Sequence, residues 1–98
     1  MPSVVRSLEW TAWARADLLA IVDYISDDNP DAAQHLKDEL EQKAERLREF
    51  PGLFRSGRVP GTREMVAHAN YVVVYAEDDS AVRILRVLHA AQQWPVDD

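Results

Sequence analysis

Residues 61–75, GTREMVAHANYVVVY, and residues 82–91, VRILRVLHAA, carry the clearest structural signal in this chain. Both are rich in residues that favour strands, and the acidic residues 77–80, EDDS, separate them as a turn does. Three strands are therefore expected, with connections short enough for an antiparallel meander. They cover residues 62–68, 70–76 and 82–89.

The last of these strands ends in a histidine, and its two faces differ in composition. Alternate side chains of a strand point to opposite faces of the sheet. Val82, Ile84 and Arg86 belong to the set with more β-branched bulk, so this set is expected to face the core. The other set then places His89 on the open face of the sheet, together with Arg83.

Two amphipathic helices are expected ahead of the meander, forming an antiparallel hairpin because only about four residues join them. Thr11 is a suitable N-cap for the first helix, and the sequence DDNP at residues 27–30 ends it. Asn29 caps the second helix, which ends by the sequence FPG at residues 50–52. Apolar residues recur every three or four positions, as on one face of a helix. They are Ala14, Leu18, Ile21, Val22 and Ile25 in the first helix, and Ala33, Leu36, Leu40, Ala44 and Leu47 in the second.

The remaining segments complete an α+β fold. Residues 3–10 are expected to form an N-terminal strand, and residues 53–61, with two glycines and a proline, a loop. The order is then one strand, a helical hairpin and a three-stranded antiparallel meander, with the hairpin packed on one face of the sheet. A chain of 98 residues is expected to be one domain, residues 1–98.

Composition narrows the function classes. The chain has no cysteine, which excludes disulfides and thiolate metal sites, and no metal or cofactor is expected. No apolar run approaches the roughly 20 residues that span a bilayer, so a cytoplasmic protein without membrane contact is expected. The formal net charge is −6 and there are only two lysines, Lys37 and Lys43. Tight nonspecific binding to nucleic acid is disfavoured, because such binding depends on many Lys and Arg contacts to phosphate.

Three arginines, Arg55, Arg58 and Arg63, surround the predicted loop in this otherwise acidic protein. One interpretation is contact with phosphate or with an acidic protein partner. The other is neutralisation of acidic side chains on the second helix. Arg63 is the stronger candidate for a contact, because a strand would hold it in place.

The tryptophans have different expected roles. Trp94 lies in the C-terminal tail, where an exposed indole would serve as a contact anchor. Trp10 and Trp13 flank the junction of the first strand and first helix, and both are expected to lie in the core.

The local sequence resembles a known family over nearly the whole chain. The matching segments are WTAWA (10–14), DL (17–18), YI (24–25), NPDAA (29–33), FP (50–51), GRVPGTRE (57–64), YVVVY (71–75) and RVLHAA (86–91). As an ordered set they resemble the RelE/ParE superfamily of toxins from type II toxin–antitoxin modules. The fold of that superfamily, a helical hairpin on a curved antiparallel sheet, agrees with the fold expected from periodicity.

The resemblance implies a growth-inhibiting toxin that a cognate antitoxin neutralises, with DNA contacted only through the antitoxin. RelE-like members are ribosome-dependent endoribonucleases that cut mRNA, whereas ParE-like members poison DNA gyrase. The lysine-rich surface of the nucleases is missing here and their arginine pair is incomplete, so the ParE-like branch is favoured. A RelE-like nuclease and a regulatory or interaction protein without toxicity stay open as alternatives. Whether the chain is an enzyme depends on this choice.

The nuclease alternative has two candidate catalytic residues. His89 matches the histidine at the end of the last strand in several nuclease members, and Arg63 matches an arginine of their second sheet strand. Cleavage by the RNA 2′-hydroxyl needs a base, cations near the phosphate and an acid for the leaving oxygen. A structural role for His89, bonded to a backbone carbonyl, is the other interpretation. For a gyrase poison, the expected contact residues are Arg55, Arg58, Arg63 and Trp94.

Overall fold

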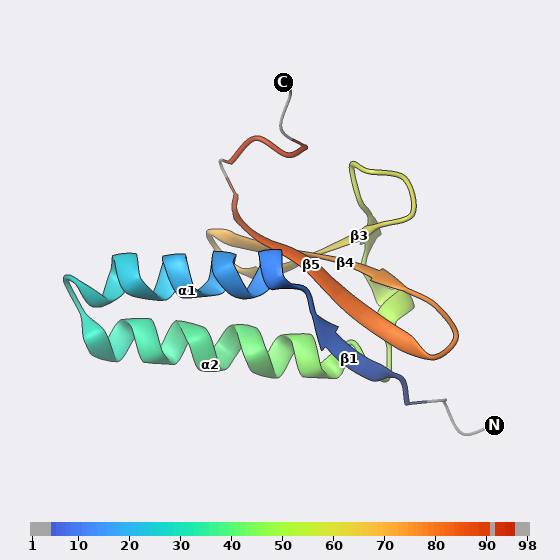
Figure 1. Cartoon of the computed structure of the whole chain (residues 1–98), viewed down its shortest axis with the longest axis horizontal. Coiled ribbons are helices and arrows are strands. Elements are labelled where there is room, and N and C mark those ends of the chain that lie inside the picture. The colour runs from blue at the N-terminus through green and yellow to red at the C-terminus, as the bar shows by residue number, and fades with distance from the viewer. Residues whose placement is uncertain (1–4, 91, 96–98) are drawn as a thin grey trace.

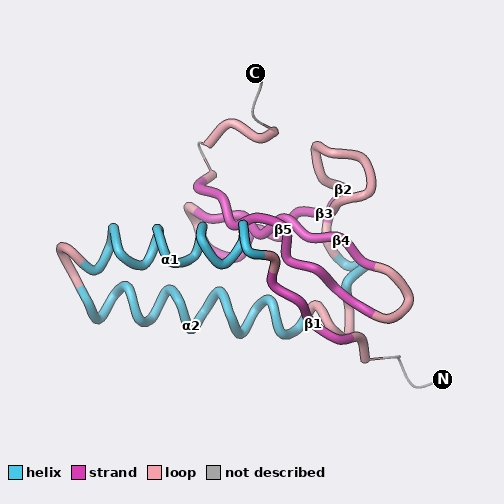
Figure 2. The backbone as a smooth tube through the Cα atoms, in the orientation of Figure 1, coloured by secondary structure: helices cyan, strands magenta, loops and turns pink. Residues whose placement is uncertain are grey.

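The computed structural model describes residues 5–90 and 92–95. In this part of the chain a helical hairpin lies against one face of a β-sheet, as Figure 1 and Figure 2 show. The loop at residues 57–62 and the C-terminal residues 92–95 lie on the other side of the sheet. None of the helices in the described residues is both long and apolar enough to cross a membrane.

The hairpin consists of α1 (Ala12–Ser26) and α2 (Pro30–Arg46), with the caps expected from the sequence. The Thr11 hydroxyl accepts a hydrogen bond from the backbone N–H of Ala14 at 3.1 Å. The Asn29 side chain accepts one from the N–H of Ala32 at 3.0 Å, and Pro30 occupies the first turn. These bonds satisfy backbone donors that a helix start otherwise leaves unpaired.

Within residues 5–90 and 92–95 the sheet has five strands, in the order β1-β5-β4-β3-β2. A short 3-10 helix, Pro51–Leu53, precedes β2. Strand β1 pairs parallel with β5, and the other neighbours pair antiparallel. The strands are β1 (Ser7–Trp10), β2 (Arg55–Ser56), β3 (Arg63–His68), β4 (Tyr71–Glu77) and β5 (Ala81–His89).

The predicted meander is confirmed, since β3, β4 and β5 each begin and end within one residue of expectation. The N-terminal strand is shorter than predicted, because pairing with β5 starts only at Ser7. Of its predicted residues, positions 3 and 4 lie outside the described part of the chain. The sequence also missed β2, which has two residues inside the predicted loop and so shows no alternation.

The prediction for the faces of β5 is wrong beyond Ile84. Val74 of β4 is opposite Arg86, but the next residue, Tyr75, is opposite Ile84. Leu85 is therefore an extra residue in β5, and such a bulge shifts the alternation by one position. As a result Val87 joins Ile84 on the face that packs against the hairpin, and Arg86 lies on the other face.

The core lies between the hairpin and this face of the sheet. Each apolar position predicted for α2 is buried, from Ala33 to Leu47. Leu40 packs there with Val73, Tyr75 and Ile84, and all four are 0% exposed. The tryptophan prediction is half right: Trp10 packs against the core, whereas Trp13 is 71% exposed. Trp13 misses the core because Ala14 and Leu18 define the buried side of α1.

Candidate functional site: an arginine–tryptophan network on the open face

The open face of the sheet is the one turned away from the hairpin. Glu64 of β3 and Arg86 of β5 are both opposite Val74 of β4, so all three side chains share this face. Val74 is 0% exposed and Leu88 only 2%, although neither α1 nor α2 covers this face in the described part of the chain. The loop at residues 57–62 and residues 92–95 lie over it (Figure 1).

Glu64 is a buried carboxylate, 3% exposed, that holds the loop at residues 57–62 on the sheet through Arg58. Its Oε1 accepts a hydrogen bond from Arg55 Nη2 at 3.1 Å, and its Oε2 accepts one from the backbone N–H of Arg58 at 2.9 Å. Arg58 Nε lies 3.6 Å from the same Oε2. A buried charge is unfavourable unless it is paired and hydrogen-bonded, and Glu64 is both. The interpretation that Arg55 and Arg58 neutralise acids of α2 is therefore wrong, because their partner is in β3.

Arg86 is fixed by Asp17 of α1 in a two-pronged ion pair. The Nε–Oδ2 distance is 2.7 Å and the Nη2–Oδ1 distance is 3.0 Å. Asp17 Oδ2 also accepts the backbone N–H of Val87 at 3.0 Å, which places Asp17 at the edge of β5 beyond the end of β1. The hydrogen bond that Arg86 donates to Asp17 raises the pKa of Arg86, against the opposing effect of burial. Arg86 is thus a permanent, oriented cation.

Two indole rings flank this cation. The Arg86 guanidinium carbon lies 5.5 Å from the ring centre of Trp13 and 5.3 Å from that of Trp94, within the range of cation–π attraction. The backbone carbonyl of Trp94 accepts a hydrogen bond from Arg58 Nη1 at 3.3 Å. The tail therefore folds back to meet the loop.

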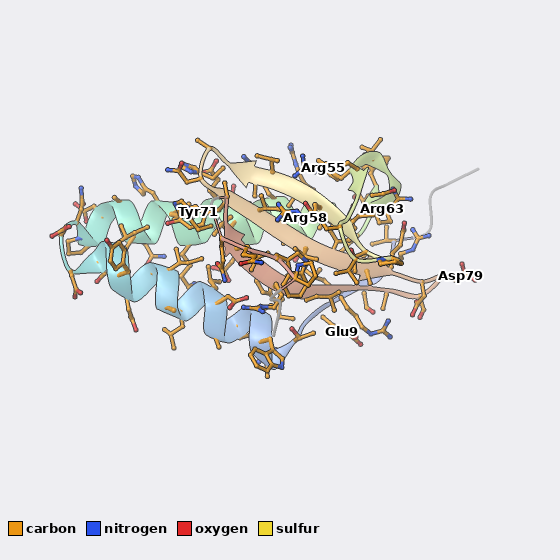
Figure 3. All side chains as sticks on the ribbon, turned by 90° about the horizontal axis from the view of Figure 1, so that it is seen from above. Glu9, Arg55, Arg58, Arg63, Tyr71 and Asp79 are labelled. Atoms are coloured by element: carbon orange, nitrogen blue, oxygen red, sulfur yellow. The ribbon has the colours of Figure 1, made fainter. Side chains whose placement is uncertain are left out.

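These contacts form one continuous series across the open face, linked through the backbone carbonyl of Trp94, which we call the arginine–tryptophan network. Figure 3, seen from above, shows Arg58 over the sheet and Arg55 at its margin. Asp17 is 69 residues from Arg86 in sequence, so no local spacing could have revealed their pairing. The network consists of Asp17, Trp13, Arg86, Trp94, Arg58, Glu64 and Arg55.

Arg63, the favoured arginine of the sequence analysis, lies outside the network. It is opposite Tyr75, so it points to the face of the sheet that Glu64 does not share. Its Nε is 3.0 Å from Glu77 Oε1, and its Nη1 donates to the backbone carbonyl of Phe54 at 2.9 Å. The predicted cluster of three arginines is thus divided between the two faces.

His89 also lies away from Arg63. It is opposite Tyr71, and the two rings meet edge to face at 5.5 Å. His68 approaches Tyr71 from the other side, with ring centres 6.1 Å apart. Because Tyr71 is four residues from Tyr75 in β4, Arg63 and His89 are separated by about 13 Å along the strands and about 10 Å across them. Figure 3 shows the labelled Tyr71 and Arg63 at opposite ends of the sheet.

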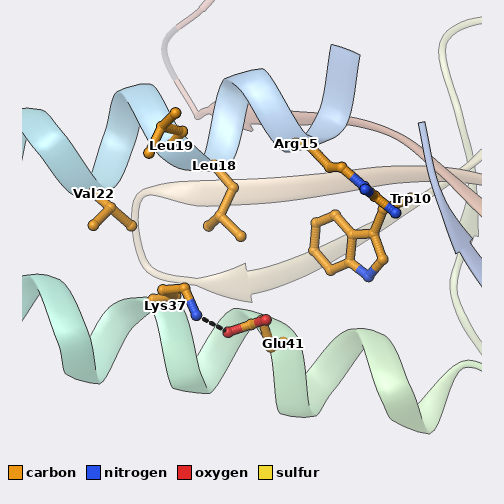
Figure 4. Close-up of a pocket in the computed structure, with 7 residues that line it drawn as sticks. All are labelled: Trp10, Arg15, Leu18, Leu19, Val22, Lys37 and Glu41. Atoms are coloured by element: carbon orange, nitrogen blue, oxygen red, sulfur yellow. Dashed lines mark hydrogen bonds and ion pairs between the residues drawn. The ribbon is translucent and has the colours of Figure 1, made fainter. Parts of the chain in front are cut away.

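The hairpin carries a second concave surface, the hairpin groove. Figure 4 shows this cavity of about 370 Å³ between α1 and α2. Along α1 its lining is apolar at Leu18, Leu19 and Val22 but also includes Arg15. Leu19 is 62% exposed, and the Lys37–Glu41 ion pair of 2.6 Å lines the cavity on α2. The lining residues are Trp10, Arg15, Leu18, Leu19, Val22, Lys37 and Glu41.

The fold and its sequence match one family. A family model for the ParE toxin of the type II toxin–antitoxin system parDE matches residues 8–94. The chain belongs to this toxin family. The resemblance to RelE/ParE superfamily toxins is therefore confirmed, and the toxin has the α+β fold expected from it.

Two relatives resemble the toxin over most of their length. A putative toxin, Y4kP, of Sinorhizobium fredii is 38% identical over 91 residues, which are 92% of this chain and 94% of that protein. Toxin RelE2 of Caulobacter vibrioides is 41% identical over 85 residues, which are 85% of this chain and 93% of that protein.

Two solved structures share the fold. The chromosomal ParDE toxin–antitoxin system of P. aeruginosa has a chain with a TM-score of 0.81 and 26% identity, covering 89% of this chain and 98% of that one. The toxin–antitoxin complex RelBE2 of Mycobacterium tuberculosis has one with a TM-score of 0.62 and 26% identity. That match covers 91% of this chain and 95% of the other.

Proposed function

We propose that this toxin inhibits growth by binding a protein target, DNA gyrase, without chemistry of its own. The observation that carries the proposal is the separation of Arg63 from His89. A nuclease would use them together, with acid–base groups within about 3 Å of the reacting atoms. Arg63 is instead already paired with Glu77 and with the carbonyl of Phe54.

The distribution of charge supports a protein target over RNA. The formal net charge is −6, so long-range attraction to ribosomal RNA or DNA is absent or repulsive. The cations of the open face are local, and both arginines that pair with Glu64 reach solvent: the side chains of Arg55 and Arg58 are 58% and 43% exposed. Arg55, Arg58 and Trp94 are therefore the proposed target contacts on the open face. Arg63 is a further candidate on the other face.

The proposed partner that holds the toxin inactive is a cognate antitoxin. Two structural neighbours come from toxin–antitoxin systems, and the hairpin groove offers this chain an apolar surface for a peptide that folds as it binds. DNA would then be contacted through the antitoxin. Expression of the toxin alone should arrest growth, and co-expression with the antitoxin should restore it. Unrestricted growth with the intact toxin alone would favour the second alternative, a regulatory or interaction protein without toxicity.

The experiment that tests the target is induction in cells, with plasmid supercoiling and mRNA cleavage measured in parallel. We expect loss of supercoiling before any change in mRNA ends. Ribosome-dependent cuts at unchanged supercoiling would refute gyrase as the target.

The RelE-like alternative rests on one observation, the ring cluster of His68, Tyr71 and His89 at the end of the sheet. Two imidazoles could serve as acid and base there. In that case His89→Ala would lower cleavage by about 100-fold or more, the usual worth of a general base. The gyrase proposal expects His89→Ala to remain toxic.

A further inference from the structure

The open face has a cavity beside Trp94, one of the proposed target contacts. It measures about 290 Å³ and is lined by Thr11, Trp13, Leu85, Arg86 and Trp94. Pockets for small molecules usually measure about 300–1,000 Å³. This cavity is thus at the lower limit for a ligand and suits a single large side chain.

The Thr11 hydroxyl and two of the Arg86 nitrogens in its lining are already engaged within the toxin. The Thr11 hydroxyl donates to the carbonyl of Leu85 at 3.1 Å and accepts from the N–H of Ala14 at 3.1 Å. Arg86 directs Nε and Nη2 to Asp17. What the cavity offers an incoming group is therefore mainly aromatic and aliphatic surface.

The two tryptophans that line the cavity have features that binding of another protein would satisfy. Trp13 is 71% exposed, although the indole is among the side chains that gain most from burial. The indole nitrogen of Trp94 is buried and makes no hydrogen bond within the described part of the chain. Exposed tryptophan beside arginine is the composition typical of energetic centres in protein–protein interfaces.

The charged residues beside the cavity favour a partner of negative charge. Arg58 donates to the Trp94 carbonyl, and the exposed guanidinium groups of Arg58 and Arg55 share the single carboxylate of Glu64. A local surplus of positive charge thus borders an apolar cavity on a protein of net charge −6. An acidic segment with one large apolar side chain complements both features, whereas a nucleic acid would be repelled by the protein as a whole.

We propose that the cavity between Trp13 and Trp94 is the anchor site for the target. It receives one aromatic or long aliphatic side chain from an acidic segment of gyrase, whose carboxylates meet Arg55 and Arg58. The inference rests on the proposed function and adds to it the chemistry of the surface that gyrase must present. The antitoxin has the hairpin groove as a separate surface.

The test compares Trp13→Ala with Tyr24→Ala in the full chain. Both residues are aromatic, both lie on α1, and they are 71% and 79% exposed, so neither change removes core packing. Affinity for purified intact gyrase and for the antitoxin would be measured by calorimetric titration, with thermal stability as a check on folding. We expect Trp13→Ala to weaken gyrase binding by about 30-fold, as for an interface centre, and Tyr24→Ala to change it less than about twofold. Antitoxin binding should be unchanged in both.

The outcomes separate this inference from the proposed function. If the unmodified toxin does not bind gyrase, both fail. If it binds and Trp13→Ala binds equally well, only the anchor site fails. If Trp13→Ala loses affinity for the antitoxin but keeps its affinity for gyrase, the cavity belongs to the antitoxin and the inference is overturned. The inference is also overturned if Trp13→Ala loses affinity only for single-stranded RNA. If the partner segment is acidic, the affinity of the toxin for gyrase should fall as the salt concentration rises. This fall should be less steep for Arg58→Gln than for the unmodified toxin.

Discussion

The two faces of the sheet are both buried, but by different kinds of neighbour. On the hairpin face, Val73 and Ile84 pack against apolar residues of α2 such as Leu40, and all are 0% exposed. On the open face, Val74 is equally buried, yet its neighbours across the sheet are the charged residues Glu64 and Arg86. The first face is held by apolar area and the second by ion pairs and ring contacts.

This difference indicates that the hairpin face mainly stabilises the fold and that the open face mainly serves recognition. Apolar burial is worth about 25 cal/mol per Å² and is insensitive to the identity of a partner. The ion pairs of Glu64 have a buried carboxylate, but their arginine ends, Arg55 and Arg58, are exposed. If the Arg58 side chain is lost, Glu64 keeps its hydrogen bonds from Arg55 and from the backbone N–H of Arg58. Changes on the open face should therefore alter binding more than folding.

The largest effect on folding is expected in the hairpin face. Leu40→Ala removes a fully buried side chain and should lower the free energy of unfolding by about 2–5 kcal/mol. Leu19→Ala, at a leucine 62% exposed on α1, is the control and should change it by less than about 0.5 kcal/mol. Denaturant unfolding followed by circular dichroism measures both. Equal effects would mean that the hairpin does not cover the sheet as described.

The next largest effect is expected where the two faces meet, at Asp17. Asp17→Ala leaves Arg86 without its carboxylate and Val87 N–H without an acceptor, at a cost of about 2–3 kcal/mol. The double variant Asp17→Ala with Arg86→Met should be less destabilised than Asp17→Ala alone, because no unpaired charge remains. An additive loss in the double variant would show that the ion pair is not the cause.

A smaller effect concerns the hydrogen bond from the Tyr75 hydroxyl to the carbonyl of Pro51, at the end of the hairpin face. Tyr75→Phe should cost about 1 kcal/mol. Burial raises the pKa of Tyr75 to about 12, from an ordinary value of 10.0. The unfolded chain therefore loses this proton first as the pH rises, and this contribution to stability is complete below pH 10 and is lost toward pH 12. Unfolding midpoints between pH 9 and 12 should fall more steeply in the unmodified toxin than in Tyr75→Phe; parallel curves would exclude this origin.

The smallest effect on folding is expected on the open face. Arg58→Gln should change the free energy of unfolding by less than about 0.5 kcal/mol while weakening toxicity several-fold. Arg46→Gln, an exposed arginine in the last turn of α2, is the matched control and should keep full toxicity. Arg63, the further candidate contact, is left unchanged in this variant. Its loss would also break the contacts of Arg63 to Glu77 and Phe54. Full toxicity in Arg58→Gln would remove this arginine from the target surface.

The same division separates what the sequence could predict from what it could not. The apolar repeat from Ala33 to Leu47 and the caps Thr11 and Asn29 act within a few residues, so they could be read directly. The bulge at Leu85 depends on pairing with β4, and it moved His89 and Arg86 to faces opposite to those expected. Trp13 and Asp17 joined the candidate site only through Arg86, a contact across most of the chain.

The most direct test of the account is inhibition of purified gyrase by the toxin and two single variants, in one supercoiling assay. His89→Ala changes the ring cluster at the end of the sheet, and Trp13→Ala changes the arginine–tryptophan network. We predict that His89→Ala inhibits gyrase as strongly as the unmodified toxin, and that Trp13→Ala needs at least about ten times more protein for the same inhibition. The reverse pattern, with activity lost in His89→Ala and kept in Trp13→Ala, would contradict the assignment of function to the open face.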